Sequence, residues 1–401
     1  MMAFRDLAEL SVDYALRLGA EYAEARVQED RVSEYVVKNG VPEVVSTHSG
    51  LGLGVRVIVD GALGFASANR PERGVVEGAV KSAVDMARAS ARTLRKPVRM
   101  SEEEARVDRW ETRVVKPPED VSDEDKIELL MDVDRASTSV GVKIPYRLFE
   151  LIETKTLKYF VNSDGARIEG SASRTLFAGF LTAFEAGSTE QDIIEVGASG
   201  GWEVVEGWSL VDKVSRRAET LGRILREARP APKGRVDLVL GSQVVGLVVH
   251  ESVGHPYEAD RILGREAAQA GESFVKPEML GQRIGSEVAT VVDDPTIEGS
   301  YGYYLYDDEG VRARRRYLMK NGVINEFLHN RETAAEMGFR SNASARASSY
   351  DVEPLIRMAN TFMLPGEMTF EELVEDVRLG VYMKTFGEWN IDDRRFNMRF
   401  V

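Results

Sequence analysis

The sequence of 401 residues contains no cysteine and only four histidines. Without cysteine the chain as given has no disulfide, no thiol nucleophile and no thiolate metal ligand. It also lacks any run of eighteen apolar residues, so we expect no membrane span. The N-terminal stretch has no basic segment and carries acidic residues early, unlike a secretory signal. We therefore expect a cytoplasmic protein.

Positive charge is in the minority. The chain has 52 Lys and Arg against 66 Asp and Glu, a formal net charge of −14. Such a surface repels phosphate backbones, so we expect no nucleic-acid partner. The main basic cluster, Arg312, Arg314, Arg315 and Arg316, follows the acidic "DDEG" at 307–310. We interpret it as a strand that exchanges charge with its neighbour.

Several nucleotide and hydrolase motifs are also absent. The sequence contains neither a GxxxxGK[ST] loop nor a GxSxG elbow, which leaves P-loop and serine-hydrolase functions without support. "SGLGLGVRV" holds Gly52 and Gly54, but a strand rather than a helix follows and the third glycine is missing. We predict that these glycines permit a bulge or tight turn within a sheet.

The length favours two or three domains, and the element pattern predicts an α+β fold. Two helix–antiparallel-sheet–helix units, which indicate a duplication, precede a β-rich C-terminal domain that carries the metal-site helix. "LRKPVRMSEEEARVDRWETRVVKPPEDVSDED" is charged, interrupted by proline and poorly periodic, and is interpreted as a linker. The expected units are 1–95, a linker at 96–121, 122–229 and 234–401.

Helical and alternating apolar patterns locate the expected elements. The expected helices span about 4–18, 71–92, 123–138, 210–228 and 369–379. The expected N-terminal strands span about 23–28, 34–37, 43–47, 55–59 and 62–66, with turns at "KNG" and "VDG", followed by strands between 147 and 186. The expected C-terminal strands span 301–306, 311–319 and 323–328. The apolar, alternating end "FNMRFV" is typical of a strand cut short, so we expect a truncated C-terminal domain.

The stretch "VVHESVGHPYEAD", residues 248–260, gathers two of the four histidines beside a glutamate. It follows an apolar helix for which Gly241 and Ser242 supply an N-cap. His250, Glu251 and His255 could simply be helix-end residues with satisfied polar atoms. Their clustering favours a metal site instead.

Their spacing conflicts with a regular helix. Residues five apart on an α-helix point about 140° away from each other, so one ion could not contact both imidazoles. A π-bulge would bring His250 and His255 onto one face. Alternatively the helix ends at Gly254 and His255 is extended, because Pro256 disfavours the helical conformation before it. An undistorted helix would rule out a shared metal.

Zinc is the natural ion for neutral imidazoles with oxygen or sulfur partners. His250 and His255 would be its ligands, whereas Glu251 would not ligate. Glu251 would take a proton from zinc-bound water and pass it to the leaving amine, as general base and then acid. The pattern therefore predicts a metallopeptidase.

"HESVGHPYEAD" resembles the HExxxH segment of the TldD/PmbA peptidases. "DDPTIEGSYGYYLYDDEGV" and "SNASARASSYDVEPLIRMANTFMLPGE" resemble C-domain signatures of that family, and "SGLGLGVRVIVDGALGFASAN" its N-domain signature. The resemblance implies a TldD-type, HExxxH-bearing subunit with zinc on His250 and His255 and with Glu251 catalytic. It also implies cleavage of unfolded or short peptides inside a dimer cavity. The dimer would be a homodimer or a heterodimer with a TldE/PmbA-like subunit.

The resemblance implies a third zinc ligand, a cysteine in a C-terminal GxCGKxGQ-like segment, that this chain lacks. The alternatives are His329, Glu258, water or a residue beyond the given sequence. With two histidines alone, zinc would be weakly bound or absent. The competing functions are a catalytically inactive peptide-binding member of the family and a regulator of a topoisomerase or DNA; the net charge gives the latter no support.

Overall fold

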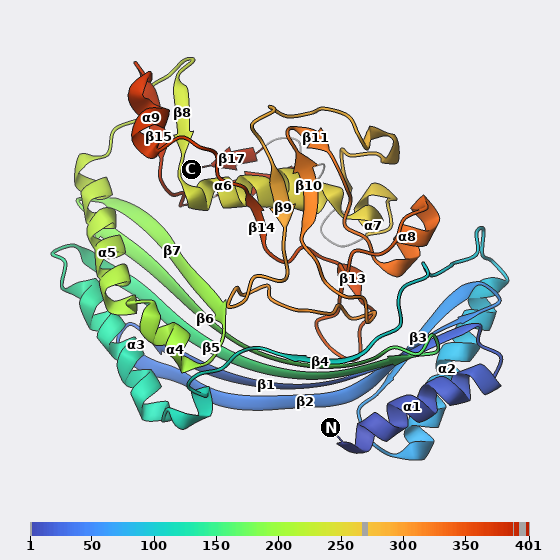
Figure 1. Ribbon diagram of the computed structural model, residues 1–401. Coiled ribbons are helices and arrows are strands. Elements are labelled where there is room, and N and C mark those ends of the chain that lie inside the picture. Colours follow the sequence, from blue (N-terminus) through green and yellow to red (C-terminus); the bar gives the residue numbers. More distant parts are fainter. Residues whose placement is uncertain (1, 267–271, 388, 393–397, 401) are drawn as a thin grey trace.

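A computed structural model describes residues 2–266, 272–387, 389–392 and 398–400 of the chain. One large curved sheet runs through its N-terminal half (Figure 1). The strand order is β3-β2-β1-β5-β6-β4, with β7 also paired to β6. Neighbours are antiparallel except β4, which runs parallel to β6. The strands are β1 (Tyr22–Lys38), β2 (Val41–Val59), β3 (Ala62–Ala68), β4 (Val107–Glu111), β5 (Lys143–Asn162), β6 (Arg167–Glu185) and β7 (Ser188–Ser199).

The two N-terminal units share this sheet because β1 pairs with strands of both. Its partner in the first unit is β2, with Tyr22 opposite Ile58. Its partner in the second is β5, with Glu24 opposite Asn162. The α+β class and the order of helices and antiparallel strands are confirmed. The separate sets of short strands are wrong, since single strands extend across both units.

The predicted turns at "KNG" and "VDG" are confirmed. Asn39 and Gly40 have φ angles of 50° and 78°, and Asp60 and Gly61 have 50° and 73°. Two successive left-handed residues form the tight turn that matches the twist of a hairpin. These turns fix the register of β1 against β2 and of β2 against β3.

Helices cover the two ends of the convex face of the sheet (Figure 1). Apolar side chains of β1 at one end, including Ala23, Ala25 and Val27, form a core with the first helix pair. Tyr35 and Val37 join a second core at the other end. The helices are α1 (Met2–Arg17) and α2 (Arg73–Ala91) at the first end, and α3 (Asp123–Thr138), α4 (Trp202–Gly207) and α5 (Leu210–Glu227) at the second. The helices predicted at 4–18, 71–92, 123–138 and 210–228 are confirmed as α1, α2, α3 and α5.

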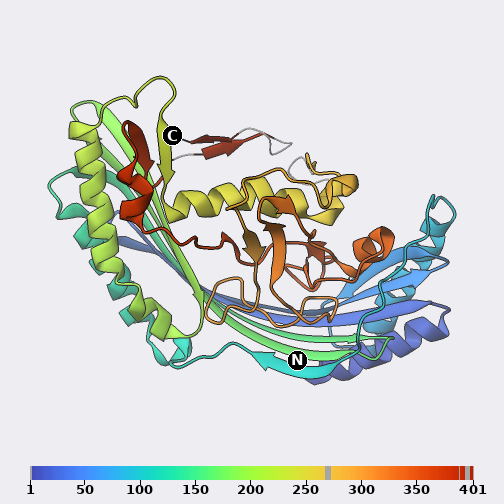
Figure 2. The same cartoon turned by 45° about the horizontal axis from the view of Figure 1, so that its top comes forward.

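The C-terminal region lies against the concave side of the sheet (Figures 1 and 2). Its largest sheet has the order β11-β10-β9-β14. The pairs β12–β13 and β16–β17 are antiparallel, and β8–β15 is parallel. The strands are β8 (Asp237–Leu240), β9 (Val291–Asp293), β10 (Arg316–Lys320), β11 (Val323–Ile324), β12 (Ala345–Arg346), β13 (Leu355–Ile356), β14 (Thr361–Met363), β15 (Gly380–Met383), β16 (Trp389–Ile391) and β17 (Met398–Phe400).

Short helical segments connect these strands. The α-helices are α6 (Ser242–Val249), α7 (Ala259–Ile262), α8 (Arg331–Met337) and α9 (Phe370–Glu375). A π-turn, η2 (His250–Gly254), and 3₁₀ turns η3 (His255–Tyr257) and η5 (Pro277–Met279) accompany them. Within the predicted linker, β4 and the 3₁₀ turn η1 (Pro118–Asp120) were not anticipated. No helix in the described part of the chain is long and apolar enough to cross a membrane.

One C-terminal expectation is wrong and a second is confirmed in part. The strand predicted at 301–306 is wrong: this segment is a loop with an isolated bridge between Tyr306 and Arg312. Tyr303, Tyr304 and Tyr306 are buried there, filling space between the sheet and the C-terminal region. Of "FNMRFV", residues 398–400 form β17, whereas 396, 397 and 401 lie outside the described residues.

The glycines of "SGLGLG" allow the C-terminal region to approach the sheet. A side chain at Gly52 would come 2.3 Å from the Tyr350 ring, and one at Gly54 2.2 Å from the Tyr350 carbonyl oxygen. The register shift between β1 and β2 lies elsewhere, between Val36 and Val37. The predicted bulge at these glycines is therefore wrong, and close packing explains them instead.

The acidic turn at 307–310 is buried and forms ion pairs with the sheet. Glu309 lies 2.6 Å from Arg56, which also contacts Glu24 at 2.9 Å. Asp308 lies 2.8 Å from Lys158. Since buried charges require partners, these pairs fix where the C-terminal region sits on the sheet.

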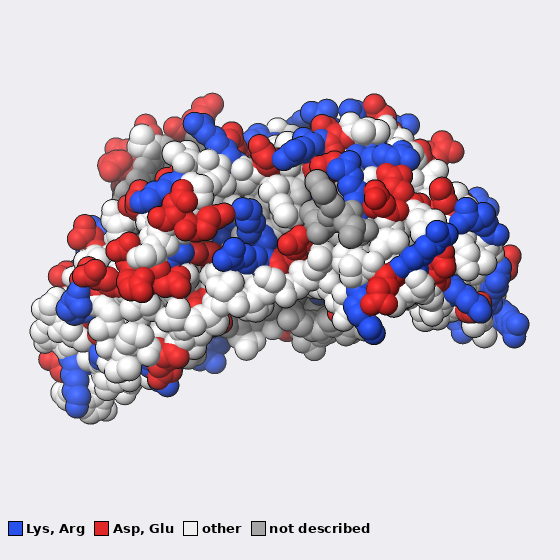
Figure 3. Space-filling view, turned by 90° about the horizontal axis from the view of Figure 1, so that it is seen from below, with Lys and Arg blue, Asp and Glu red and all other residues white. Residues whose placement is uncertain are grey.

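The basic cluster also exchanges charge with neighbouring segments, as expected. Arg314 lies 2.7 Å from Glu326, and Arg315 lies 2.7 Å from Asp294. Arg316 is fully buried against Asp293 of the adjacent strand. On the face shown in Figure 3, acidic and basic side chains are intermixed.

Candidate metal centre

The histidine segment continues helix α6 into the C-terminal core. Val249, Val253 and Tyr257, spaced four residues apart, are buried among apolar side chains of the C-terminal sheet. The backbone N–H of Leu328 donates to the carbonyl of Tyr257 at 2.8 Å, and that of Ala259 donates to the carbonyl of Leu328 at 3.0 Å. Apolar packing and these backbone bonds hold both ends of the segment.

Regular helix ends at Val249, and the next five residues form the π-turn. The N–H of His255 donates to the carbonyl of His250, a bond between residues five apart. Gly254 is buried here, and a Cβ at this position would come 1.8 Å from Met358 Sδ. Glycine therefore permits the close packing of this turn.

Of the two distortions considered, the π-bulge is confirmed and the extended conformation is wrong. His255 has φ −60° and ψ −43°, which is helical. Pro256 is accommodated because it occupies the first turn of η3, where its missing N–H is not needed. The rings of His250 and His255 consequently lie together, with centroids 4.7 Å apart and planes at 87°.

Glu251 completes the cluster. One potential ligand atom from each of His250, Glu251 and His255 lies within 4.8 Å of the others. Nε2 of His250 is 3.8 Å from a carboxylate oxygen of Glu251. The side chain of His250 is 45% exposed, whereas that of Glu251 is 3% exposed. One imidazole therefore faces solvent beside a buried carboxylate.

Glu258 contacts Nδ1 of the His255 ring. Its carboxylate is fully buried, 3.1 Å from His255 Nδ1, and also pairs with Arg261. A carboxylate accepts from a protonated Nδ1, which leaves Nε2 with a free lone pair. Burial, and then the negative charge of Glu258, raise the pKa of Asp260 to about 6. Glu258 was considered from the sequence as an alternative zinc ligand, whereas its carboxylate lies against His255 Nδ1; the i,i+3 spacing of the two residues was the signal for this contact.

His329 lies outside the cluster. Its ring is buried, 3.1 Å from Thr333 Oγ1 and packed near Phe339. Burial lowers the pKa of His329 to about 4, against a smaller opposing effect of Glu326. Among the described residues, then, the metal-ligand types that come together are those at 250, 251 and 255.

The donor set is compatible with zinc but incomplete. Two neutral imidazoles suit the ion, and the orientation of His255 matches that of a metal ligand. A third nitrogen or sulfur ligand does not join them within the described chain. Such a site can bind zinc and activate water beside a buried carboxylate.

Sequence comparisons identify three stretches similar to one family. The PmbA/TldA metallopeptidase domain 1, central domain and C-terminal domain match residues 23–91, 116–221 and 233–400. A metalloprotease from Methanothermobacter thermautotrophicus is 34% identical over 91% of this chain and 76% of its own length. One from Methanocaldococcus jannaschii is 32% identical over 93% and 80%, respectively. A zinc metalloprotease TldD homolog from Saccharolobus solfataricus is 35% identical over 40% and 35%.

Solved structures share the fold. A proposed modulator of DNA gyrase from Bacteroides thetaiotaomicron superposes with a TM-score of 0.76 and 18% identity, covering 98% of this chain and 85% of that one. TldE from Thermococcus kodakarensis gives a TM-score of 0.70 and 19% identity, covering 98% and 84%. At these identities the likeness establishes the fold alone.

Proposed function

The chain belongs to the PmbA/TldD family of metallopeptidases, as its motifs predicted, and on that basis we propose that it is a zinc-dependent peptidase. Its substrates would be unfolded or short peptides, hydrolysed inside the cavity of a dimer. The observation that carries the proposal is the π-turn, which brings His250 and His255 together beside Glu251. In a regular helix the two rings would diverge and could not share an ion.

Each residue of the turn has a distinct role in this proposal. His250 and His255 would hold zinc through imidazole nitrogens, and Glu258 orients the ring of His255. Zinc, when bound, supplies a Lewis acid that polarises the scissile carbonyl and makes water more acidic. Glu251 takes the proton of the attacking water and delivers it to the leaving amine. Its burial separates this proton from bulk solvent.

The incomplete donor set favours a second candidate function. The described cluster offers two imidazoles, and the chain contains no cysteine to complete it. Zinc affinity would then be low, and the protein would bind peptides without cleaving them. Zinc content and peptide hydrolysis, measured on the same protein, distinguish the two candidates.

The test compares wild type, Glu251→Gln and the exposed control Glu278→Gln. We expect about one zinc per chain in all three, and cleavage of an unfolded peptide slower by about 10²- to 10⁴-fold in Glu251→Gln alone. His250→Ala and His255→Ala should lose zinc. Equal cleavage by wild type and Glu251→Gln would contradict the catalytic role. A zinc-free wild type that binds but does not cleave peptide would support the second candidate.

The proposed dimer has two forms, a homodimer or a heterodimer with a TldE/PmbA-like subunit. The fold shared with TldE supports a partner of related structure. Peptide held as an added β-strand would be recognised mainly through its backbone, with little side-chain selection. Light scattering of the protein alone, and mixed with a TldE-like subunit, measures which form exists; a monomer under both conditions would argue against the dimer cavity.

A further inference from the structure

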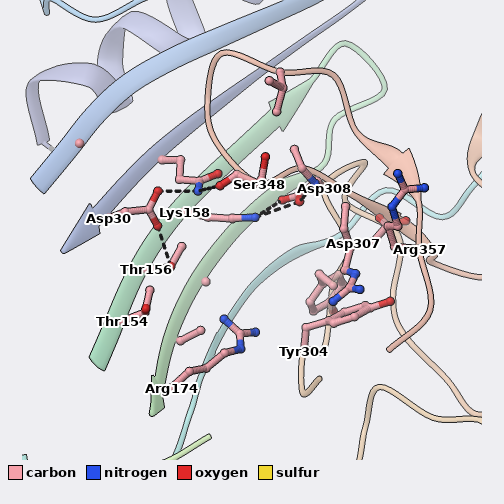
Figure 4. A pocket seen from close by; sticks show the side chains of 18 of the residues that line it. Asp30, Thr154, Thr156, Lys158, Arg174, Tyr304, Asp307, Asp308, Ser348 and Arg357 are labelled. Atoms are coloured by element: carbon pink, nitrogen blue, oxygen red, sulfur yellow. Dashed lines mark hydrogen bonds and ion pairs between the residues drawn. The ribbon is translucent and has the colours of Figure 1, made fainter. Parts of the chain in front are cut away.

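A cavity of about 760 Å³ lies between the concave face of the sheet and the C-terminal region (Figure 4). Its floor consists of alternate side chains from β1, β5 and β6, and its roof of the loops that contain Tyr304 and Ser348. The residues at 250, 251 and 255 are not among those that line it. This cavity is therefore separate from the candidate metal centre.

Small floor residues create the space. Gly170, Ala172, Thr154 and Thr156 line the strands where larger side chains would fill the gap. Aromatic and aliphatic groups, including Trp110, line other parts of the cavity. Polar and apolar side chains therefore line both the floor and the roof of a space that accommodates a few residues of extended peptide.

Four cationic side chains line the cavity together with four acidic ones, Asp30, Asp307, Asp308 and Glu353. Two of the cations are neutralised in ion pairs. Lys158 lies 2.8 and 2.9 Å from the two carboxylate oxygens of Asp308. Arg357 lies 2.9 Å from Glu266. Arg174 and Arg346 form no ion pair with a carboxylate in the described part of the chain; their hydrogen bonds go to backbone carbonyls.

These two guanidinium groups are fixed in place. Arg174 donates to the carbonyls of Tyr301 and Tyr303, both at 2.9 Å. Arg346 donates to the carbonyl of Met358 and lies 5.7 Å from the centre of the Tyr304 ring. Figure 4 shows Arg174 and Tyr304 on facing walls of the cavity. Arginine has five N–H donors, so each group keeps several for a ligand.

The two arginines also repel each other. Burial, followed by the positive charge of Arg346, lowers the pKa of Arg174, against smaller opposing effects of Tyr301, Asp308 and Asp30. The buried Nε of Arg346 has no hydrogen-bond partner in the described structure. Two fixed, mutually repelling guanidinium groups are stabilised when an anion binds between them.

We propose that Arg174 and Arg346 bind the carboxylate of a peptide in this cavity; the choice of a peptide rests on the proposed function. Met358 provides a physical link to the metal centre. Its carbonyl accepts from Arg346, and its sulfur packs against Gly254 of the π-turn. A peptide anchored here by its C-terminal carboxylate would lie one side-chain layer from that turn.

The test uses full-length Glu251→Gln, so that bound peptide is not hydrolysed. Calorimetry compares an N-acetylated tetrapeptide with a free C-terminal carboxylate against the same peptide as an amide. We expect the acid to bind about tenfold to a hundredfold more tightly, the difference expected for hydrogen bonds to a charged group. Arg174→Met and Arg346→Met, added separately, should abolish this preference. Arg340→Met, at an exposed position, should preserve it.

Titration with inorganic phosphate tests whether the cavity is a site for free anions rather than for a peptide carboxylate. Phosphate binding that needs both arginines, together with equal affinity for acid and amide, would overturn the peptide assignment. Equal acid preference in every arginine variant would overturn the site itself. Urea unfolding of each variant identifies loss of fold, and two variants on different elements keep the comparison decisive. If wild type hydrolyses peptide but Glu251→Gln binds acid and amide equally, this inference is rejected and the proposed peptidase is not. If Glu251→Gln prefers the acid but wild type does not hydrolyse peptide, the proposed peptidase is rejected and this inference is not.

Discussion

At the scale of single residues, the buried imidazole of His329 couples folding to pH. Its pKa is about 4 in the folded protein, against an ordinary value of 6.5. As pH falls from 6.5 to 4, the unfolded chain takes up this proton and the folded chain does not, so stability falls. At roughly 1.4 kcal/mol per pKa unit, the loss is about 3 kcal/mol.

His329→Gln should remove this part of the pH dependence. Its free energy of unfolding, measured by urea at pH 7 and pH 4, should fall less on acidification than that of wild type, by up to about 3 kcal/mol. The acidic residues titrate in both proteins and cancel in the difference. Parallel pH profiles for the two proteins would show that His329 takes up its proton as readily in the folded state as in the unfolded chain, and would contradict the prediction.

That His250, Glu251 and His255 lie together could be expected from the sequence, whereas their orientation could be expected only in part. Two histidines and a glutamate at the end of an apolar helix suggest metal chemistry from sequence alone, and their spacing indicated the distortion. The role of Glu258 depends on the π-turn followed by η3, which together direct its carboxylate at His255 Nδ1. Local sequence does not specify that direction.

At the scale of elements, the π-turn depends on the packing of Gly254 against Met358. Gly254→Ala keeps an allowed backbone, since φ is −56°. Its Cβ would nevertheless come 1.8 Å from Met358 Sδ. We expect the free energy of unfolding to fall by about 1–3 kcal/mol, with weaker zinc binding, measured by urea unfolding and zinc titration.

Two further variants separate packing from helix propensity. Gly246 lies in the same helical segment, and no atom is within 4 Å of a Cβ added there. Gly246→Ala should therefore raise the free energy of unfolding by up to about 1 kcal/mol. Met358→Ala removes the clashing sulfur, so the double variant with Gly254→Ala should lose less than the sum of the two single changes. Strict additivity would contradict the packing explanation.

The four helices α1, α2, α3 and α5 were predictable within a few residues because each buries one apolar stripe. The helix predicted at 369–379 is shorter, since α9 spans Phe370–Glu375 and has no buried residue. The strands were not predictable in this way, because burial changes along them. In β1, Ala23, Ala25 and Val27 pack under the first helix pair, and Tyr35 and Val37 under the second. The polar residues between, such as Arg31, have no helix above them and interrupt the pattern used for prediction. One strand therefore resembled two.

At the scale of the whole molecule, the position of the C-terminal region could not be predicted. It depends on contacts between residues some 250–320 positions apart, including Arg56 with Glu309 and Arg26 with the carbonyl of Ser349. Residue types suggested the charges of the turn at 307–310 but not their partners.

Arg56 tests whether these ion pairs hold the two regions together. Its guanidinium lies between Glu24 and Glu309, and all three side chains are at most 4% exposed. Arg56→Met would leave two buried carboxylates without their cation, so we expect a loss of about 3–5 kcal/mol in the free energy of unfolding. Arg73→Met removes an exposed pair with Glu77 and should cost about 0.5 kcal/mol or less. Urea unfolding measures both; similar losses would mean that the buried pairs do not determine docking.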